Sequence, residues 1–579
     1  MKKDMLPRTE LAEILYSFRK SFYTAGFFSM FINLLALIPS IYMLQVYDRV
    51  LQSRNVTTLV MLTVIMLGFY VMLGMLELSR SRLLIRVGAQ LDMKLNSRVF
   101  AASFERNLRQ AGANAGIAMA DLQAVRQFLT GNGLFAFFDA PWAPIYLAVI
   151  FLFNPWLGVF AVLSSLLLFS LAWATEALTR KPLAEAGTMS AAANSYATNN
   201  LRNAEVIEAM GMLENLKGRW LEKQLRFLSL QNEASDKAAA ISATTKAVRI
   251  AVQSLALGGG ALLVIDGSLT PGGMIAASIL IGRALSPVET AIAVWKQLLG
   301  ARTSYHRLED LLKEHPQREE GMDLPAPRGN LMVEAVTAGA PGSQMVILKQ
   351  IGFSVPPGEI VGIIGPSASG KSTLARLLVG VWPALAGKVR LDGADIYAWN
   401  KVRLGPSVGY LPQDIELFEG TIAENISRFG PVDSQKVVEA AQLAGVHEMI
   451  LRLPKGYDSE IGTGGCVLSG GQRQRIGFAR AVYGNPAFIV LDEPNSNLDD
   501  AGETALVRSI LELKRRGTTV VLITHRTNVI SVVDTLLLLV DGSIQAFGPR
   551  DKVLATLHQK ATPATSTNSQ PALTAIAKR

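Results

Sequence analysis

The sequence predicts an all-α membrane domain of six transmembrane helices, followed by a soluble α/β domain. Composition supports the membrane part: 50% of the 579 residues are hydrophobic and only 18% are charged, against about 25% charged in a typical soluble protein. Long uncharged segments occupy the first 300 residues, whereas short β-branched runs alternate with helical stretches in the remainder. The sequence patterns of the two halves therefore predict different folds.

Each predicted span is a stretch apolar and long enough to cross a bilayer, which takes about 20 residues. Ser21–Tyr47 has no charged residue in 27 positions, and Ala140–Thr175 has none in 36. The second segment is interrupted by Asn154-Pro155-Trp156, which indicates two helices joined by a tight turn. The six spans are predicted at about 22–46, 56–77, 133–153, 156–176, 248–266 and 268–290.

Changes in composition predict the remaining boundaries. Residues 1–20 form a basic N-terminal segment, and the membrane domain takes residues 21–300. A charged, Pro-rich stretch predicts a linker over 301–330. The α/β domain is expected over 331–560, and a flexible Ala-, Thr- and Ser-rich tail over 561–579.

Basic residues predict how the spans are oriented in the lipid bilayer. The net charge is +9, and residues 1–300 hold 27 Lys and Arg against 19 Asp and Glu. Basic residues gather in 80–126 and 180–249, while the turns near Asn154 and Asp266 have none. Because basic loops stay in the cytoplasm, we expect both termini and the α/β domain there. The charge excess serves topology, so no nucleic-acid partner is expected.

A phosphate-binding loop follows the hydrophobic strand predicted at 360–364. The pattern G-x-x-x-x-G-K-[ST] is met by Gly365, Pro366, Ser367, Ala368, Ser369, Gly370, Lys371, Ser372 and Thr373. Its glycines let backbone N–H groups surround phosphate oxygens at a helix N-terminus. Lys371 is expected to reach the β- and γ-phosphates of ATP, and Ser372 to ligate Mg²⁺.

A second buried-strand pattern, at 488–492, ends in Asp492 and is followed by Glu493. One acid at a strand end suits Mg²⁺, which takes few carboxylates and keeps several waters. The neighbouring carboxylate is placed to polarise an attacking water. An Asp-Glu pair after a strand is by itself most often a solvated turn, but the upstream phosphate loop favours a metal ligand, Asp492, and a catalytic base, Glu493.

Further motifs stand in the order that ATP-binding cassette (ABC) proteins have, and this half of the chain resembles that family. The motif residues are Gln413, the signature Ser469, Gly470, Gly471 and Gln472, then Asp499 and His525. The resemblance implies that Gln413 binds Mg²⁺ and that His525 contacts the γ-phosphate and orients the attacking water. It implies that the signature residues and Asp499 belong to the nucleotide site.

The same resemblance implies a composite site, because cassettes of this family pair head to tail. Ser469 and Gly471 of one chain then meet the γ-phosphate held by Lys371 of the other. Since the chain has one cassette and six spans, we expect a homodimer with the type I ABC exporter fold. One departure stands out: Ala340 lies where the family usually has an aromatic residue that stacks on adenine. Weaker ATP binding or looser base selectivity is expected from it.

The membrane half resembles one branch of these proteins. Segments 39–51, 138–144 and 282–287, together with 491–499, are similar to type I secretion exporters, and most of all to the alkaline-protease and haem-binding-protein secretion ATPases. The likeness implies an inner-membrane exporter of an unfolded protein with a C-terminal signal. A periplasmic membrane fusion protein and a TolC-like outer-membrane channel are the partners it implies.

Two other functions stay open at this point. One is a half-transporter that exports a lipid or a drug. The other is a nucleotide-gated channel or regulatory protein, which the complete set of nucleotide-site motifs disfavours.

Two charged residues also lie within predicted spans. Arg283 either snorkels to the membrane interface or serves substrate passage. Asp139 lies two residues before Pro141, and a role as a helix cap is slightly favoured over a functional role.

Overall fold

The computed structural model describes residues 9–109, 115–201, 203–317, 321, 323–343, 345–462 and 468–561. The chain divides into two compact units, residues 1–107 with 112–317 and residues 318–579 with 108–111. The first unit is all-α and the second is α/β, as the sequence predicts. Of the tail predicted at 561–579, all but residue 561 lies outside the described residues.

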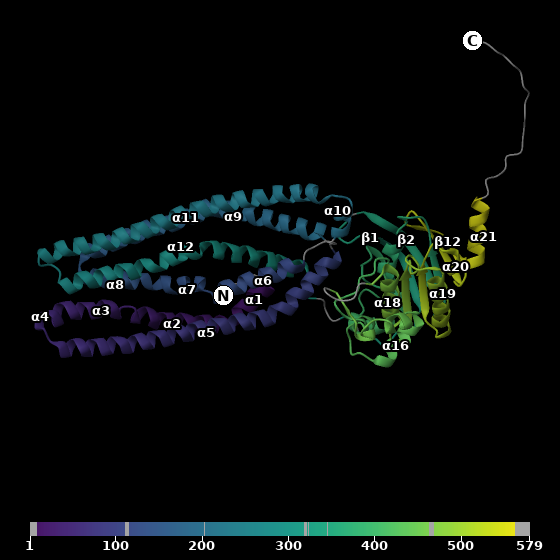
Figure 1. Ribbon diagram of the computed structural model, residues 1–579, viewed down its shortest axis with the longest axis horizontal. Helices are drawn as coiled ribbons and strands as arrows, with labels where there is room; N and C mark the ends of the chain where they lie inside the picture. The colour runs from purple at the N-terminus through teal and green to yellow at the C-terminus, as the bar shows by residue number, and fades with distance from the viewer. Residues whose placement is uncertain are drawn as a thin grey trace, which may run out of the picture. The chain divides into compact units, whose positions relative to one another are not determined.

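Six helical spans in the described part of the chain are long and apolar enough to cross a membrane, which agrees with the predicted number (Figure 1). In chain order they are α2 (Arg19–Leu35), α3 (Ile38–Gln45), the π-helix η1 (Val46–Val50) and α4 (Leu51–Ser53) together; α5 (Val56–Arg109); α6 (Ala115–Thr130), α7 (Asn132–Asp139), the 3-10 helix η2 (Ala140–Trp142) and α8 (Ala143–Phe153) together; α9 (Pro155–Leu201); α11 (Leu213–Ile265); and α12 (Pro271–Glu314). Two short helices, α1 (Glu10–Ser17) and α10 (Ala204–Ala209), complete the unit.

The long helices continue well past the apolar stretches that predicted them. Helix α12 runs to Glu314, so the linker predicted for 301–330 begins only after the helix ends. Leu308, Leu311 and Leu312 explain the extension, because they are buried in one cluster with residues of α1, α5 and α6. Their spacing of three and four residues places them on one helix face. The buried contacts of that face keep the C-terminal part of α12 helical, although its charged residues predicted a linker there.

Asp48 connects the end of the first span to the start of the last. It lies in η1, and its carboxylate accepts hydrogen bonds from the Thr270 hydroxyl at 2.6 Å and the Gly272 N–H at 2.8 Å. A Cβ atom at Gly272 would lie 2.7 Å from the Asp48 carboxylate, so only glycine allows this approach. The carboxylate thus satisfies the exposed N-terminus of α12.

The second unit is built on a six-stranded sheet with the order β12-β11-β3-β10-β9-β6. Its strands are β3 (Ile360–Ile364), β6 (Val408–Leu411), β9 (Phe488–Asp492), β10 (Thr519–Ile523), β11 (Thr535–Val540) and β12 (Ser543–Pro549). All neighbours pair in parallel except β11 and β12. Every residue of β9 and β10 is buried, as expected for parallel strands that are covered on both faces.

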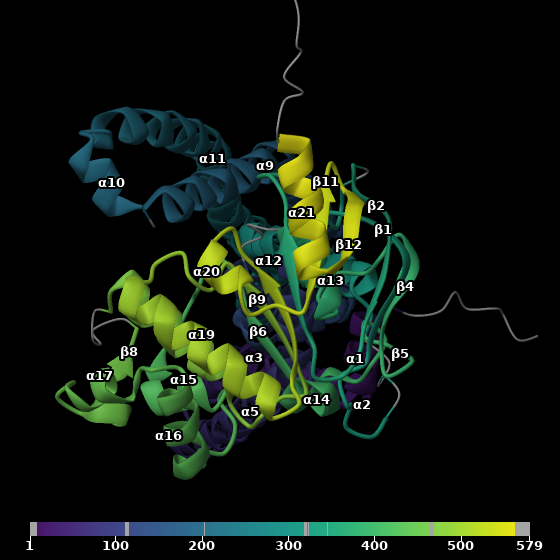
Figure 2. The ribbon, with the colours of Figure 1, turned by 90° about the vertical axis from the view of Figure 1, so that its right-hand side faces the viewer.

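Both faces of this sheet are covered (Figure 2). Val520 and Leu522 of β10 pack toward helices that include α15 (Ile422–Ile426), α16 (Ser434–Leu443), α18 (Gly470–Val482) and α19 (Asp500–Arg515). Val521 and Ile523 pack toward α13 (Lys371–Leu378) and a second sheet, β2-β1-β4-β5. This second sheet consists of β1 (Leu331–Gly339), β2 (Val346–Val355), β4 (Ala386–Leu391) and β5 (Ala394–Asp395). The remaining elements are α14 (Lys401–Leu404), η3 (Gly405–Ser407), β7 (Gly420–Thr421), α17 (His447–Leu451), η4 (Gly456–Asp458), β8 (Glu460–Ile461), α20 (Thr527–Ile530) and α21 (Arg550–Ala561).

Candidate nucleotide-binding site

The phosphate loop joins the end of β3 to the start of α13. Ala368 and Gly370 have positive φ angles of 64° and 99°, which curl the backbone into a concave loop. Gly365 has no space for a side chain, because a Cβ atom there would lie 2.0 Å from the carbonyl oxygen of Leu539. The Nζ atom of Lys371 lies 2.9 Å from the Gly365 carbonyl oxygen and 2.8 Å from the next one. Its ammonium group therefore lies against the loop's own backbone, beside the helix N-terminus.

Asp492 has the environment of a metal ligand. Burial raises the pKa of its carboxyl group, which a hydrogen bond with the Ser372 hydroxyl lowers again. The Oδ1 atom of Asp492 is buried and has no hydrogen-bond partner among the described residues. A native structure rarely leaves such an atom without a partner. A carboxylate oxygen beside a hydroxyl group fits Mg²⁺, which takes oxygen ligands.

The charges of both acidic residues act on the Lys371 side chain. Burial lowers the pKa of Lys371, and the negative charges of Glu493 and Asp492 raise it. Across the described ranges, no group of three or more His, Cys, Asp and Glu side chains gathers to hold a metal.

Three neighbouring strand ends bring the catalytic candidates together. β9 lies between β10 and β6, and Glu493, His525 and Gln413 each follow one of these strands. Gln413 Nε2 donates a hydrogen bond to Glu493 Oε2 at 3.1 Å, and His525 Nε2 lies 3.7 Å from Glu493 Oε1. Glu493 has a left-handed backbone, with φ of 49°, and its N–H group donates to the Ile523 carbonyl at 2.9 Å. The fold holds the Glu493 backbone in an otherwise disfavoured conformation.

The signature residues form the N-terminus of α18. Ser469 Oγ accepts from the Gln472 N–H at 3.3 Å, and Gln472 Oε1 accepts from the Ser469 N–H at 2.9 Å, which is a capping box. Gly470 and Gly471 follow as the first helical residues. Each of the two polar side chains thus accepts from the other residue's backbone N–H, and the expectation that they contact nucleotide stays a prediction.

Asp499 also acts as a cap in the structure. Its carboxylate accepts from the Gly502 N–H at 3.0 Å at the start of α19, and Arg475 Nη2 lies 3.2 Å away. The predicted residues therefore fall into two groups. One surrounds the phosphate loop and Glu493, and the other surrounds the first turn of α18. Ala340 directly follows β1, and its effect on adenine binding stays a prediction.

Sequence reasoning missed one residue beside the signature. Gln474 is buried in α18 and hydrogen-bonds to the backbone of Glu493 and of Asn497. Its position two residues after the signature gives no hint of this role, because a polar residue in an amphipathic helix usually faces solvent. Only the packing of α18 against the loop after β9 shows it.

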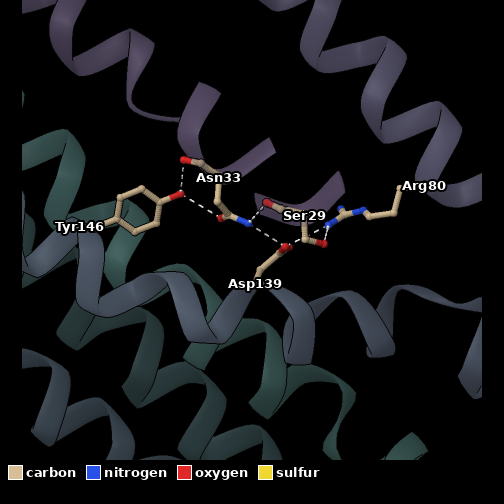
Figure 3. A network of polar contacts seen from close by, with 5 residues as sticks. All are labelled: Ser29, Asn33, Arg80, Asp139 and Tyr146. Atoms are coloured by element: carbon tan, nitrogen blue, oxygen red, sulfur yellow. Dashed lines mark hydrogen bonds and ion pairs between the residues drawn. The ribbon is translucent and has the colours of Figure 1, made fainter. Parts of the chain in front are cut away.

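Asp139 belongs to a polar network in the membrane unit (Figure 3). Asp139 Oδ1 accepts from Arg80 Nη1 and from Asn33 Nδ2, each at 2.9 Å. Arg80 Nη1 also lies 2.7 Å from Ser29 Oγ, and the Tyr146 hydroxyl donates to the Asn33 carbonyl at 2.8 Å. The helix cap predicted for Asp139 is wrong, because its side chain makes no cap hydrogen bond to η2. It instead pairs with a cation on α5, 59 residues away.

Arg283 lies on the exposed side of α12 in the single chain. Both predicted roles, snorkelling and substrate passage, stay predictions for it.

The two units match two family descriptions. Residues 22–287 match the description "ABC transporter transmembrane region", and residues 348–496 match "ABC transporter". The type I secretion system ATP-binding protein PrsD of Rhizobium meliloti (strain 1021) is 45% identical over 545 residues, which cover 94% of this chain and 94% of that protein. This chain belongs to the type I secretion ABC exporters. It is an ATPase with a multi-pass membrane domain.

Other relatives agree with that assignment, and one solved structure has the same fold. The toxin RTX-I translocation ATP-binding protein of Actinobacillus pleuropneumoniae is 30% identical, over 93% of this chain and 77% of its own length. The alpha-hemolysin translocation ATP-binding protein HlyB of Escherichia coli is 29% identical over the same shares. A bacterial Atm1-family ABC exporter with ATP bound has the same fold, with a TM-score of 0.78 over 95% of this chain and 99% of that chain at 23% identity. Membership supports the secretion hypothesis over the lipid or drug half-transporter and the regulatory channel.

Proposed function

We propose that this type I secretion exporter works as a homodimer in the bacterial inner membrane and drives out an unfolded protein that carries a C-terminal signal. Hydrolysis of ATP with Mg²⁺ supplies the energy. A periplasmic membrane fusion protein and a TolC-like outer-membrane channel continue the path. The concentration of basic residues in 80–126 and 180–249 supports a cytoplasmic position for the ATPase unit and both termini.

One observation carries the proposal of hydrolysis. Side chains from adjacent strand ends surround Glu493 and Asp492, and the two carboxylates have different neighbours. The Glu493 carboxylate is held by Gln413 at 3.1 Å and faces His525 at 3.7 Å. The Asp492 carboxylate lies beside the Ser372 hydroxyl and keeps one buried oxygen without a partner. These contacts support a division of roles, in which Glu493 receives a proton and Asp492 holds a cation.

The side chains around the phosphate loop suit phosphoryl transfer to water. Ser372 and Asp492 would hold Mg²⁺, with Gln413 as a third ligand, and the bound ion would neutralise charge on the β- and γ-phosphates. Lys371 and the N–H groups of the loop bind the phosphates. Glu493 accepts a proton from water while the water oxygen bonds to the γ-phosphorus and the bond to ADP breaks. His525 orients that water.

The signature end of α18 suits the partner's γ-phosphate. Ser469 caps a helix of 13 residues, and the glycines that follow carry no side chain to keep an anion away from the N–H groups. In a head-to-tail dimer this end faces the phosphate that Lys371 of the other chain binds. Gln472 and Asp499 support the site indirectly, since one completes the capping box and the other pairs with Arg475.

Glu493→Gln tests the base. The amide cannot accept the proton, so we expect phosphate release to fall by about 10²–10³-fold, while ATP binding stays near that of the parent. Both are measured on purified protein, and the exposed Glu439→Gln on α16 serves as the control. Cells carrying Glu493→Gln should also lose specific proteins from the medium by mass spectrometry. Parental turnover in Glu493→Gln contradicts this assignment.

Mixing two impaired chains tests the homodimer. Lys371→Met damages the phosphate loop of its own chain, and Ser469→Asp places a negative charge against the phosphate held by the partner. Each variant alone should hydrolyse ATP at about a tenth of the parental rate or less. Co-expression under two affinity tags should yield mixed dimers with one intact site and clear ATPase activity. Inactive mixed dimers, with both tags recovered, contradict the composite site.

A further inference from the structure

Gln474 connects α18, the helix that begins at the signature, to the loop that follows β9 and carries Glu493. These two segments are called the signature helix and the catalytic loop below. Gln474 is 2% exposed, and its side chain leaves α18 toward the loop that follows β9. Nε2 donates to the Glu493 carbonyl oxygen at 3.1 Å and lies 3.2 Å from Ser496 Oγ, and Oε1 accepts from the Asn497 N–H at 2.9 Å. Both donor hydrogens and the acceptor oxygen of this amide are therefore engaged with residues 493–497.

The contact falls on a strained point of the backbone. Glu493 has a φ angle of 49°, a left-handed conformation that costs a residue with a side chain about 1–2 kcal/mol. Its N–H group bonds to the Ile523 carbonyl on the β10 side, at 2.9 Å. On the other side, its carbonyl oxygen takes hydrogen bonds from Gln474 and from the Ser496 N–H, at 3.1 and 3.2 Å. Gln474 thus fixes the peptide group that directs the Glu493 side chain.

The packing around Gln474 leaves little room for adjustment. A Cβ atom at Gly471 would lie 2.8 Å from the Asn497 carbonyl oxygen, so the start of α18 touches the loop directly. The cavity that remains between α18, the loop and the start of α19 has a volume of about 10 Å³, which holds one water at most. A substitution that keeps the volume of the Gln474 side chain therefore leaves little space for water to take over the hydrogen bonds of the amide.

We propose that Gln474 is a positioning residue for Glu493: through its three hydrogen bonds it sets the direction of the catalytic carboxylate and ties that direction to the position of the signature helix. This inference rests on the proposed role of Glu493 as the base. Gln474 does not touch the phosphates. Its loss should lower the rate of the chemical step and leave ATP binding nearly unchanged.

Two substitutions test the proposal on the purified full-length exporter. Gln474→Met keeps the length of the side chain and makes none of the hydrogen bonds. Gln474→Glu keeps the acceptor and regains one donor only when its carboxyl group is protonated. Gln435→Glu, on the exposed face of α16, is the control for the charge change. Steady-state ATPase rates are measured from pH 6 to pH 8.5, with thermal unfolding midpoints to confirm folding.

We expect kcat to fall by about tenfold or more in both variants at pH 8, while KM for ATP changes less than about threefold, because the lost hydrogen bonds orient Glu493 and do not bind ATP. In Gln474→Glu the ratio of kcat to that of the parent should rise toward acid pH, since protonation restores a donor. In Gln474→Met this ratio should stay flat, and Gln435→Glu should match the parent at every pH.

A merely structural role gives a different result. It lowers the unfolding midpoint and leaves kcat of the folded protein and its pH profile like those of the parent; that outcome overturns the proposal. A pH-independent loss in Gln474→Glu also overturns it, and this measurement decides the matter even if Gln474→Met does not fold. Failure of the base itself is seen separately: Glu493→Gln would then hydrolyse ATP. An inactive Glu493→Gln beside parental Gln474 variants rejects only the positioning role.

Discussion

Two clusters of buried charged groups, one in each unit, are built in opposite ways. The nucleotide site stands on loops at the ends of parallel strands, and there Asp492 keeps a buried oxygen without a partner within the described ranges. The network of the membrane unit joins α2, α5 and α7, and there Asp139 takes hydrogen bonds from both Arg80 and Asn33. The first carboxylate is the one proposed to bind Mg²⁺, and the second takes its hydrogen bonds from the protein itself.

The difference teaches how to interpret a buried charge. Arg80 is 5% exposed, and its guanidinium group also lies over the ring of Phe135, 4.2 Å from the centroid. Such a pair holds helices together when each partner compensates the desolvation of the other. A site for chemistry instead keeps some of its polar groups free for substrate. Four substitutions test this distinction, from the largest expected effect to the smallest.

Lys371→Met should have the largest effect, because it removes the one ammonium group that lies within the phosphate loop. We expect ATP turnover to fall by about 10²–10³-fold, the usual cost of a lost group that stabilises charge in the transition state. The measurement is phosphate release per chain. Lys436→Met, at an exposed ion pair on α16, should keep the parental rate. Comparable rates for both variants would contradict the assignment of the loop.

Arg80→Met should destabilise the membrane unit by roughly 3 kcal/mol, because it removes a buried cation and leaves the partly buried Asp139 carboxylate without its ion-pair partner. The double variant Arg80→Met with Asp139→Asn should recover part of this loss. The unfolding midpoints of the four proteins in detergent give the coupling energy. Arg126→Met breaks a more exposed pair with Asp92, so it should cost about 1 kcal/mol or less. Equal costs for the two arginines would show that burial of the first pair has no energetic consequence.

Ser469→Asp separates the cap from the phosphate contact. Aspartate is as good a helix cap as serine, so the free energy of unfolding of Ser469→Asp should stay near that of the parent. Ser469→Ala removes the cap, and its free energy of unfolding should fall by about 1 kcal/mol. ATP turnover should nevertheless fall by about tenfold or more in Ser469→Asp, since its negative charge repels the partner's γ-phosphate. A parental ATPase rate in this variant would leave Ser469 with the capping role alone.

Asp492→Asn should change the stability of the folded protein only slightly, and in the stabilising direction. Burial raises the pKa of Asp492, so the folded protein prefers the neutral acid, and the charged form costs stability as the pH rises through that pKa. The neutral amide avoids this cost. At neutral pH we therefore expect a small rise of the unfolding midpoint, together with loss of ATPase activity. The gain should disappear in acid, where both side chains are neutral; a gain that persists there has another cause.

Much of the nucleotide site could be predicted from the sequence, because its residues are consecutive or follow recognisable strands. Gly365 to Thr373 form one uninterrupted loop, and Asp492 and Glu493 end a strand of continuous apolar residues. The capping roles of Ser469 and Asp499 were not predicted. Each bonds to an N–H group three residues further along, and the sequence assigned both residues to the nucleotide instead.

The sequence by itself determined the six spans and the α/β ATPase unit, because the length of an apolar segment and the spacing of a phosphate loop are local properties. Only the tertiary structure decided the partners of Asp48, Asp139 and Gln474. Asp48 meets Thr270, 222 residues away, and Asp139 meets Arg80, 59 residues away. A buried polar group must be satisfied by whatever the fold brings beside it, and no local pattern states which group that is.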